Sequence, residues 1–302
     1  MIHIVKMRIA QYEYSEKIGK GSFGTVYKGK NVNTGEKVVV KTEPYDIEYS
    51  SLKHESTIMN MLYSKYCRSI PPTYWYGIIP ETKERILVMP MFQESLEDFV
   101  LKFQGKNRIT KEYCCNIMKS MIRILGHIHS KYVVHRDVKP ANWMIHRDEL
   151  MLIDFGMSSF YVDSEEIHLK PADPLKTCMI GTPKYASLNV HCGEEYSRRD
   201  DLMSVGYIGL FLLCGSDLWC NPPSLSPDTD KFALSNHLNE WFKTQKSLDL
   251  VLEMTANDWP ELANFLNAVY SIKFDETPEY LKLEEMFSFK KNHINDKLLY
   301  SS

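Results

Sequence analysis

Two polar motifs, set among short strand-like sequences, constrain this 302-residue chain more than any other feature. HRDVKPAN occupies residues 135–142, and DFG follows at residues 154–156. The strand-like sequences VVH, WMI and LMLID lie beside these motifs and are bounded by polar loops. An accidental polar loop would have to produce both motifs in this order, downstream of a glycine-rich loop and a lysine that match them. We therefore interpret the two motifs as parts of a functional site.

The side chains of these motifs suit the transfer of a phosphoryl group. Asp137 can accept a proton from an attacking hydroxyl, and Lys139 can reach the γ-phosphate that is transferred. Asn142 and Asp154 supply the hard oxygen ligands that Mg²⁺ prefers. The spacing H-R-D-x-x-x-x-N, followed by D-F-G, therefore indicates a phosphotransferase site.

A glycine-rich loop at residues 18–26, IGKGSFGTV, has the spacing G-x-G-x-x-G-x-V at Gly19, Gly21 and Gly24. Glycines let backbone N–H groups approach phosphate oxygens closely. On its own this spacing is a weak signal, because a glycine-rich hairpin also shows it. A dinucleotide-binding loop would lie between a strand and a helix, whereas TVYKGK continues as a strand. The loop therefore predicts a flap over phosphates.

Lys41 closes the apolar strand VVVK, and Glu55 lies on the helical segment that follows it. A lysine at the end of a strand is usually a solvated charge, and most helical glutamates are exposed. Across the predicted hairpin, however, Lys41 would face the glycine-rich loop and could reach the α- and β-phosphates. Glu55 could then pair with Lys41 and hold its ammonium group in place.

The first part of the chain is predicted to be a small sheet with one inserted helix. Residues 12–41 alternate short β-favouring runs with turn signals, and VYKGK and EKVVVK flank NVNTG as a hairpin would. A helical period follows at residues 47–63, and ERILVMPM then returns to a strand-like run.

After Pro90 the character of the chain changes. Segments with helical periodicity are residues 95–104, 110–130, 200–214 and, less cleanly, 230–241 and 259–270. We predict an α+β, bilobed fold, with a small β-rich N-lobe at about residues 12–90, a hinge at about 90–94 and a larger helical C-lobe at about 95–288. Residues 289–302 would form a short C-terminal tail.

Composition excludes several classes of function. The chain has 44% hydrophobic and 25% charged residues, which is typical of a globular protein and not of a disordered one. Its net charge of −3 gives no general attraction to nucleic acid, so we expect no such partner. The seven cysteines form no CxxC pair, and no apolar run approaches the ~20 residues that span a bilayer. We expect an intracellular monomer, cytoplasmic and/or nuclear, without a membrane partner.

Longer segments resemble the casein kinase I family of serine/threonine protein kinases. The segments that carry this resemblance are HESTIMNML, SLEDF, GTPKYASLNVHCGEEYSRRDDLMSVGY and FLNAVYSIKFDETPEYLKLEEMF. In that family a Ser-Ile-Asn triplet stands where other protein kinases have Ala-Pro-Glu, and residues 187–189, Ser-Leu-Asn, occupy this place here. The resemblance covers about residues 12–288 and implies a protein-kinase-like fold with its catalytic domain there.

The resemblance also implies a role for each motif residue. Asp137 would be the catalytic base and Lys139 would contact the γ-phosphate. Asn142 and Asp154 would hold Mg²⁺, and Asp201 would brace the catalytic loop from the helix below it. The residues expected to bind ATP are Ile18, Gly19, Gly21, Gly24, Val26, Lys41, Glu55, Met89, Pro90 and Phe92.

One expected hinge residue departs from the family pattern. Met89 falls at the gatekeeper position, so Pro90 and Phe92 fall at the hinge, and Pro90 replaces the usual acidic residue. The adenine would take only a carbonyl oxygen from this position, which proline keeps, while the N–H donor would come from Phe92. We therefore expect the hinge to bind adenine despite Pro90.

The implied activity is that of an ATP- and Mg²⁺-dependent serine/threonine protein kinase. Its protein substrates would carry acidic or phosphorylated residues upstream of the Ser or Thr acceptor. Lys184 stands where relatives usually have arginine, and a basic run of relatives is replaced by SPDTDKFALSN, so a substrate phosphate should be held less specifically. The family resemblance also implies activity without phosphorylation of Thr177 or Thr182.

Two other classes of function compete with this interpretation. A pseudokinase would use the fold as a nucleotide-binding scaffold, and loss of Lys41, Asp137 or Asp154 would favour it, yet all three residues are present. A small-molecule kinase shares some of the same parts but would not explain the casein-kinase-like segment at residues 181–207.

Overall fold

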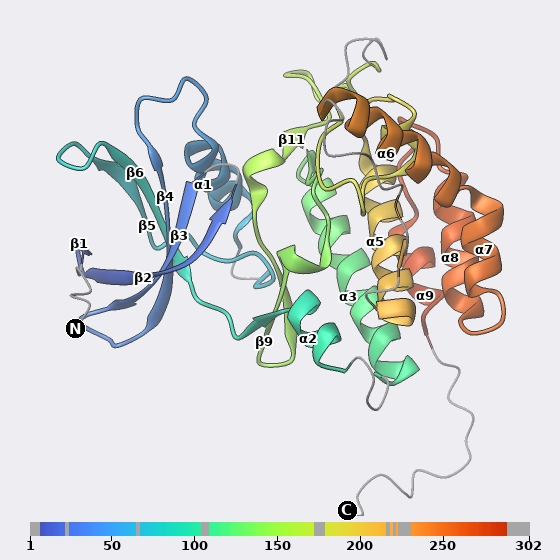
Figure 1. Ribbon diagram of the computed structural model, residues 1–302, viewed down its shortest axis with the longest axis horizontal. Helices are drawn as coiled ribbons and strands as arrows, with labels where there is room; N and C mark the ends of the chain where they lie inside the picture. Colours follow the sequence, from blue (N-terminus) through green and yellow to red (C-terminus); the bar gives the residue numbers. More distant parts are fainter. Residues whose placement is uncertain are drawn as a thin grey trace, which may run out of the picture.

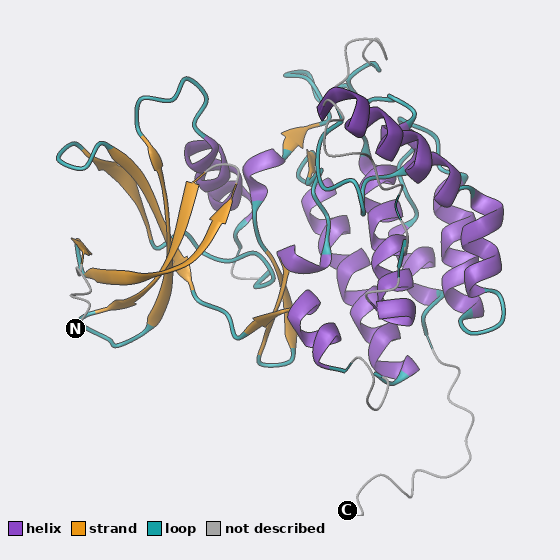
Figure 2. Cartoon of the chain, viewed as in Figure 1, coloured by secondary structure: helices purple, strands orange, loops and turns teal. Residues whose placement is uncertain are grey.

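The computed structural model consists of a β-sheet with one helix, followed by a mostly helical part (Figure 1; Figure 2). The residues it describes are 7–21, 24–64, 67–103, 109–171, 179–215, 218–219, 222 and 231–288. The predicted α+β fold with a β-rich first part and a helical second part is confirmed. The predicted tail, residues 289–302, lies outside the described residues.

The sheet has six antiparallel strands in the order β1-β2-β3-β4-β6-β5. Their bounds are β1 Met7–Ile9, β2 Tyr12–Gly21, β3 Gly24–Asn31, β4 Lys37–Pro44, β5 Trp75–Ile79 and β6 Glu84–Pro90. The predicted hairpin around NVNTG is the β3-β4 connection. Its register pairs Val26 with Lys41, and the next pair of strands sets Val39 beside Met89. Strand pairing therefore brings the glycine-rich loop, Lys41 and the predicted gatekeeper together.

Helix α1, Ser51–Leu62, begins later than the predicted start at residue 47. The reason is a cap: Ser50 Oγ accepts a hydrogen bond from the Lys53 N–H at 3.0 Å. Glu43, buried at the end of β4, accepts a second one from the Leu52 N–H at 3.2 Å. These acceptors satisfy N–H groups that have no partner within the helix, so the helix starts where they lie.

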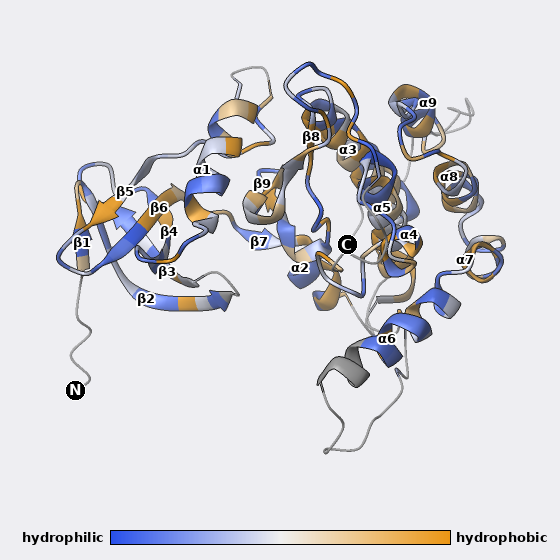
Figure 3. Ribbon diagram, turned by 90° about the horizontal axis from the view of Figure 1, so that it is seen from above, coloured by the Kyte–Doolittle hydropathy of each residue, from blue (hydrophilic) through white to orange (hydrophobic). Residues whose placement is uncertain are grey.

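The second part is built around two long helices, α3 and α5. The helices are α2 Leu96–Lys102, α3 Lys111–His129, α4 Leu188–His191, α5 Arg198–Cys214, α6 Lys231–Gln245, α7 Leu248–Thr255, α8 Pro260–Tyr270 and α9 Tyr280–Glu285. Helix α5 is buried along most of its length between its neighbours α3 and α8, whereas the described part of α6 is largely hydrophilic (Figure 3). The segments predicted as helical all contain a helix, and the short helices α4, α7 and α9 are additional.

Short β- and 3₁₀-elements carry the two polar motifs. They are β7 Glu94–Ser95, β8 Val133–Val134, η1 Pro140–Asn142, β9 Trp143–His146, β10 Glu149–Leu152, η2 Phe155–Met157 and β11 Ser159–Phe160. Strand β8 leads into HRDVKPAN, and the β9-β10 hairpin leads into DFG. The predicted strand-like sequences VVH, WMI and LMLID are thus confirmed as the strands that present both motifs.

Candidate active site

A cavity of about 650 Å³ is lined by residues of both the sheet and the helical part. Of the described residues, the predicted site residues in its wall are Ile18, Gly24, Val26, Lys41, Glu55, Met89, Pro90, Phe92, Asp137, Lys139 and Asp154. Gly19 and Asn142 do not line it, and Gly21 ends β2 next to residues outside the described part. Most of the residues that the sequence singled out from five separate segments therefore face one space.

Lys41 lies between two carboxylates in this cavity. Its Nζ is 2.6 Å from Glu55 Oε1 and 3.5 Å from Asp154 Oδ1. Burial lowers the pKa of Lys41, but Glu55 and Asp154 together raise this pKa above its ordinary value. Lys41 in turn holds the pKa of the Asp154 carboxyl below its usual range. Burial raises the pKa of the Glu55 carboxyl, although the Lys41 ammonium beside it acts in the opposite direction. The predicted Lys41–Glu55 pair is present in the structure.

Gly24 lies where two strands of the sheet approach closely. Its φ is +154°, and a Cβ there would lie 1.9 Å from the Thr42 carbonyl oxygen. Only glycine fits that space without moving β4. Because β2 and β3 form a hairpin around the loop, the strand–loop–helix arrangement of a dinucleotide site is absent from this segment.

The predicted hinge follows directly from β6. Met89 is buried, Pro90 ends the strand, and Met91 donates its N–H to the Lys37 carbonyl at 3.3 Å. Phe92 packs edge-on against the ring of His146 on β9, with centroids 5.6 Å apart. These contacts hold the backbone of the connection at the wall of the cavity.

Asp137, Lys139 and Thr182 form a closed set of polar contacts. Lys139 Nζ is 2.6 Å from Asp137 Oδ2 and donates to Thr182 Oγ1 at 3.0 Å. The Thr182 hydroxyl donates to Asp137 Oδ1 at 2.8 Å. A hydroxyl therefore already lies within hydrogen-bond reach of the predicted base, with an ammonium group beside it.

Asn142 and Asp154, the predicted metal ligands, come from the two different motifs. Asn142 donates its Nδ2–H to the Asp137 carbonyl at 2.8 Å, which leaves its side-chain oxygen for another partner. Asp154 adopts left-handed backbone angles, φ 68° and ψ 66°, a costly conformation outside glycine. Among the residues that the structure describes, no cluster of three or more His, Cys, Asp or Glu side chains could hold a metal alone.

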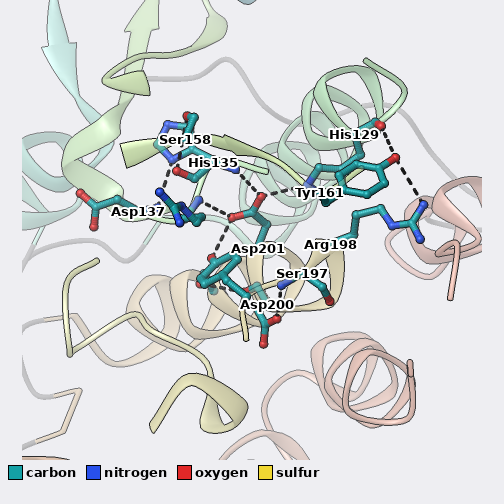
Figure 4. A network of polar contacts seen from close by, with 12 residues as sticks. His129, His135, Asp137, Ser158, Tyr161, Ser197, Arg198, Asp200 and Asp201 are labelled. Carbon is teal, nitrogen blue, oxygen red and sulfur yellow. Dashed lines mark hydrogen bonds and ion pairs between the residues drawn. The ribbon is translucent and has the colours of Figure 1, made fainter. Parts of the chain in front are cut away.

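Asp201 fixes the backbone that carries Asp137 (Figure 4). Its carboxylate accepts hydrogen bonds from the backbone N–H groups of His135 and Arg136 at 2.8 and 3.0 Å. It accepts two more from His129 Nε2 at 2.9 Å and the Tyr196 hydroxyl at 2.8 Å. Burial raises the pKa of Asp201, but these donors, His129 first, lower it below its ordinary value. The predicted bracing role of Asp201 has a direct geometrical basis.

The Ser-Leu-Asn triplet that carries part of the family resemblance binds a second buried carboxylate. Ser187 Oγ donates to Asp200 Oδ1 at 2.5 Å, and Asn189 Nδ2 donates to the same oxygen at 3.1 Å. Burial raises the pKa of Asp200 to about 6 despite these donors. The triplet is therefore tied to the start of α5 by neutral side chains.

Several residues of the cavity wall were not recognised in the sequence. They include Val39, Met144 and Ile153. Val39 lies two positions before Lys41, and alternation along a strand puts both on one face, so this residue could have been found. Ile153 directly precedes DFG, so its position in the sequence could also have indicated it. Met144 lies on β9, and only the folded structure shows that it lines the cavity.

Two basic side chains near the catalytic contacts, Arg136 and Lys184, have neighbours inside the protein. Arg136 donates its Nε–H to the Met157 carbonyl at 2.6 Å, so one of its donors already has a partner. The Lys184 ammonium lies 5.6 Å from the ring centre of Phe211 and 5.9 Å from that of Tyr185. Thr177 and the acidic residues of SPDTDKFALSN lie outside the described residues.

Comparison with known proteins supplies the class of protein that this fold and site define. Residues 12–269 match the family described as protein kinase domain, and the chain belongs to that family. It is 32% identical over 282 residues to Casein kinase I homolog 2 of Schizosaccharomyces pombe, and the alignment covers 91% of this chain. The predicted resemblance to the casein kinase I family is thus confirmed. The chain spans 61% of the length of this relative.

Proposed function

We propose that this chain is a casein kinase I-like serine/threonine protein kinase that transfers the γ-phosphate of ATP to proteins. The observation that carries the proposal is the cavity in which Lys41, Asp137 and Asp154 face one another with their partners in place. A pseudokinase scaffold would not require the full set, and each member has the contacts that phosphoryl transfer needs.

ATP binding is assigned to the wall of the cavity. The connection after Met89 would hold the adenine, through the Pro90 carbonyl and the Phe92 N–H. The hairpin around Gly24 would cover the phosphates, and Lys41, held by Glu55, would bind the α- and β-phosphates. The remaining predicted residues, Ile18, Gly19, Gly21 and Val26, belong to the same hairpin.

The donor set fits Mg²⁺ if phosphate oxygens complete the coordination. Magnesium is usually bound through one or two carboxylates together with substrate phosphates and water. The Asp154 carboxylate and the free amide oxygen of Asn142 match that need. When bound there, Mg²⁺ would neutralise charge on the phosphates.

The protein's own side chains would then move one proton and stabilise one charge. Asp137 would accept the proton of a Ser or Thr hydroxyl at Oδ1, the oxygen that now accepts a hydrogen bond from Thr182. Lys139, already between Asp137 and Thr182, would stabilise the charge that develops on the transferred phosphoryl group. A short acceptor side chain suits this geometry, because Asp137 is a buried residue in the wall of the cavity.

Acceptors with acidic or phosphorylated upstream residues are proposed as preferred substrates. Lys184 would have to leave the rings of Phe211 and Tyr185 to contact such a group. We therefore expect a weaker gain from an upstream phosphate than an exposed arginine would give. The intracellular location, the monomeric state and the lobe boundaries stay predictions. Among the described helices, none has the length and apolar character needed to cross a bilayer.

The test is transfer of ³²P from Mg-ATP to casein by the purified protein. Wild type should label casein on serine or threonine, while Asp154→Asn and Asp137→Asn should not. ATP binding without transfer in wild type would favour the pseudokinase scaffold. Labelling on tyrosine would contradict the proposed acceptor class.

A further inference from the structure

Residues 183–186 form an irregular segment whose four carbonyl groups are all held by side chains from elsewhere in the fold. Lys246 donates to the Pro183 and Ala186 carbonyls at 2.7 and 2.6 Å. Trp219 Nε1 donates to the Lys184 carbonyl at 3.0 Å, and Ser204 Oγ to the Tyr185 carbonyl at 2.8 Å. A segment outside helices and strands usually gives its carbonyls to water, so this complete set of protein donors is unusual.

Lys246 is the central donor and is completely buried, with 0% of its surface exposed. Its Nζ lies 4.7 Å from the ring centres of both Tyr207 and Phe242 and 3.0 Å from His191 Nε2. A fully buried lysine is rare in proteins, because removing an ammonium group from water is costly unless partners replace the water. Two carbonyls, an imidazole nitrogen and two ring faces replace it here.

His191 lies beside this lysine and shares one of its acceptors. Asn239 donates Nδ2–H to the His191 carbonyl at 3.0 Å, and its Oδ1 faces His191 Nδ1 at 2.5 Å. His191 Nε2 lies 3.1 Å from the Pro183 carbonyl oxygen, which also accepts from Lys246, and 3.0 Å from Lys246 Nζ. Burial lowers the pKa of His191 to about 4. Burial also lowers the pKa of Lys246, whereas its two carbonyl partners and the two ring faces favour the ammonium form.

The segment held in this way continues directly from the catalytic contacts. Gly181 has φ +91°, and a Cβ there would lie 2.5 Å from the Arg136 carbonyl oxygen, so the backbone touches the catalytic loop. Thr182 contacts Asp137 and Lys139, and its own carbonyl accepts the N–H groups of Tyr185 and Ala186 at 2.8 and 2.9 Å. This turn therefore lies beside the proposed base, which a protein acceptor would have to reach.

We propose that Lys246 is a positioning residue for the protein acceptor, acting through the backbone of residues 183–186. The proposal rests on the proposed kinase function. Lys246 lies directly after α6, which packs against α4, so these C-terminal helices would fix the surface on which the acceptor lies (Figure 3). Lys246 and residues 183–186 do not line the cavity proposed to bind ATP, so the affinity for ATP should not depend on this ammonium group.

Lys246→Met is the main test, since methionine keeps most of the aliphatic chain and removes both hydrogen bonds to the Pro183 and Ala186 carbonyls. Trp219→Phe and Ser204→Ala remove one donor each from the same segment. Thr255→Val is the matched control: Thr255 is also fully buried, but its hydroxyl bonds only to the Val251 and Leu252 carbonyls of its own helix. Each protein is compared with wild type by circular dichroism before use.

Hydrogen exchange measures the positioning without any need for activity. In Lys246→Met, the amides of residues 181–187 should exchange about tenfold faster, the scale of a lost charged hydrogen bond, while those of α1 keep the wild-type rate. In Thr255→Val, residues 181–187 should keep the wild-type rate. Unchanged exchange in a folded Lys246→Met protein would overturn the inference, whether or not the wild type is a kinase.

Steady-state kinetics measure the consequence for the acceptor. The KM for a serine peptide should rise about tenfold in Lys246→Met, with the KM for ATP within about twofold of wild type. If both KM values rise together, as a general loss of structure would cause, the positioning role is wrong. Should Lys246→Met fail to fold, Trp219→Phe and Ser204→Ala decide: each should raise only the peptide KM, and no rise in either protein refutes the proposal. A wild type without transfer activity refutes the proposed function instead.

Discussion

Replacing Asp201 with asparagine should damage both stability and catalysis, because its carboxylate accepts four hydrogen bonds in a fully buried site. The His135 and Arg136 N–H groups bind to different oxygens of this carboxylate. In either orientation, an asparagine amide therefore sets its NH₂ group against a backbone donor. One buried backbone N–H then lacks an acceptor, and so does one side-chain donor, either His129 Nε2 or the Tyr196 hydroxyl.

The cost follows from these contacts. An unsatisfied buried donor costs about 1–3 kcal/mol, and the two hydrogen bonds to the remaining oxygen each lose about 1 kcal/mol when the acceptor is no longer charged. Part of this loss is offset because asparagine does not bury a charge. We expect the free energy of unfolding to fall by about 3 kcal/mol, which lowers Tm by about 6–12 °C in a domain of this size.

Catalysis should suffer more than ATP binding. Arg136 has φ +67°, an unfavourable angle that the Asp201 contacts stabilise, and Asp137 is the next residue. A displacement of the base by about 1 Å can cost about 10²-fold in rate, so kcat should fall on this scale with little change in the KM for ATP. Thermal unfolding and initial rates measure the two effects, with the exposed Asp258→Asn as control. An Asp201→Asn protein with wild-type Tm and kcat would refute the reasoning.

Three further predictions concern charge. Lys41→Met should lower the rate of phosphoryl transfer by about 10²-fold or more, because Glu55 and the phosphates lose their cation. The control Lys30→Met, at an exposed lysine of the sheet, should have little effect. Turnover of Lys41→Met within a few-fold of wild type would contradict the role of Lys41. The pKa of His191 is lowered to about 4 in the folded protein, so as pH falls this residue takes up a proton in the unfolded state first. Tm should therefore drop between about pH 6.5 and 4, and it should drop less steeply in His191→Gln. Equal slopes of Tm against pH in both proteins would exclude His191 as the cause. Lys184→Glu should reduce any gain in kcat/KM from an upstream phosphoserine, and equal gains in both proteins would remove Lys184 from substrate binding.

Much of the fold and site could be predicted because the information is local in the sequence. Asp137, Asn142 and Asp154 lie in motifs with fixed spacing, and alternation within β4 orients Lys41. The pattern of apolar residues likewise located most of the helices. The predicted start of α1 was wrong, because the Glu43 side chain that contacts Ser50 and Leu52 at the first turn comes from β4, outside the helix.

The role of Lys246 could not be derived from the sequence for a similar reason. In KTQKS it looks like one more solvated charge after an amphipathic helix. Its burial depends on Tyr207, Phe242 and His191, which come from three different helices and meet only in the folded chain. Residues that depend on several distant segments leave no pattern that spacing alone can reveal.

Asp201 and Lys246 solve the same physical problem with opposite charges. The catalytic loop at His135 and Arg136 turns its N–H groups into the core, where only an acceptor can satisfy them, and a buried carboxylate does so. Residues 183–186 turn their carbonyls inward, where only a donor suffices, and a buried ammonium group binds two of them. Neither charge faces the cavity, so neither has to be released when substrates bind. Each loop can therefore keep an irregular backbone next to the reacting groups, and reversing either charge should disorder its loop more than removing the charge would.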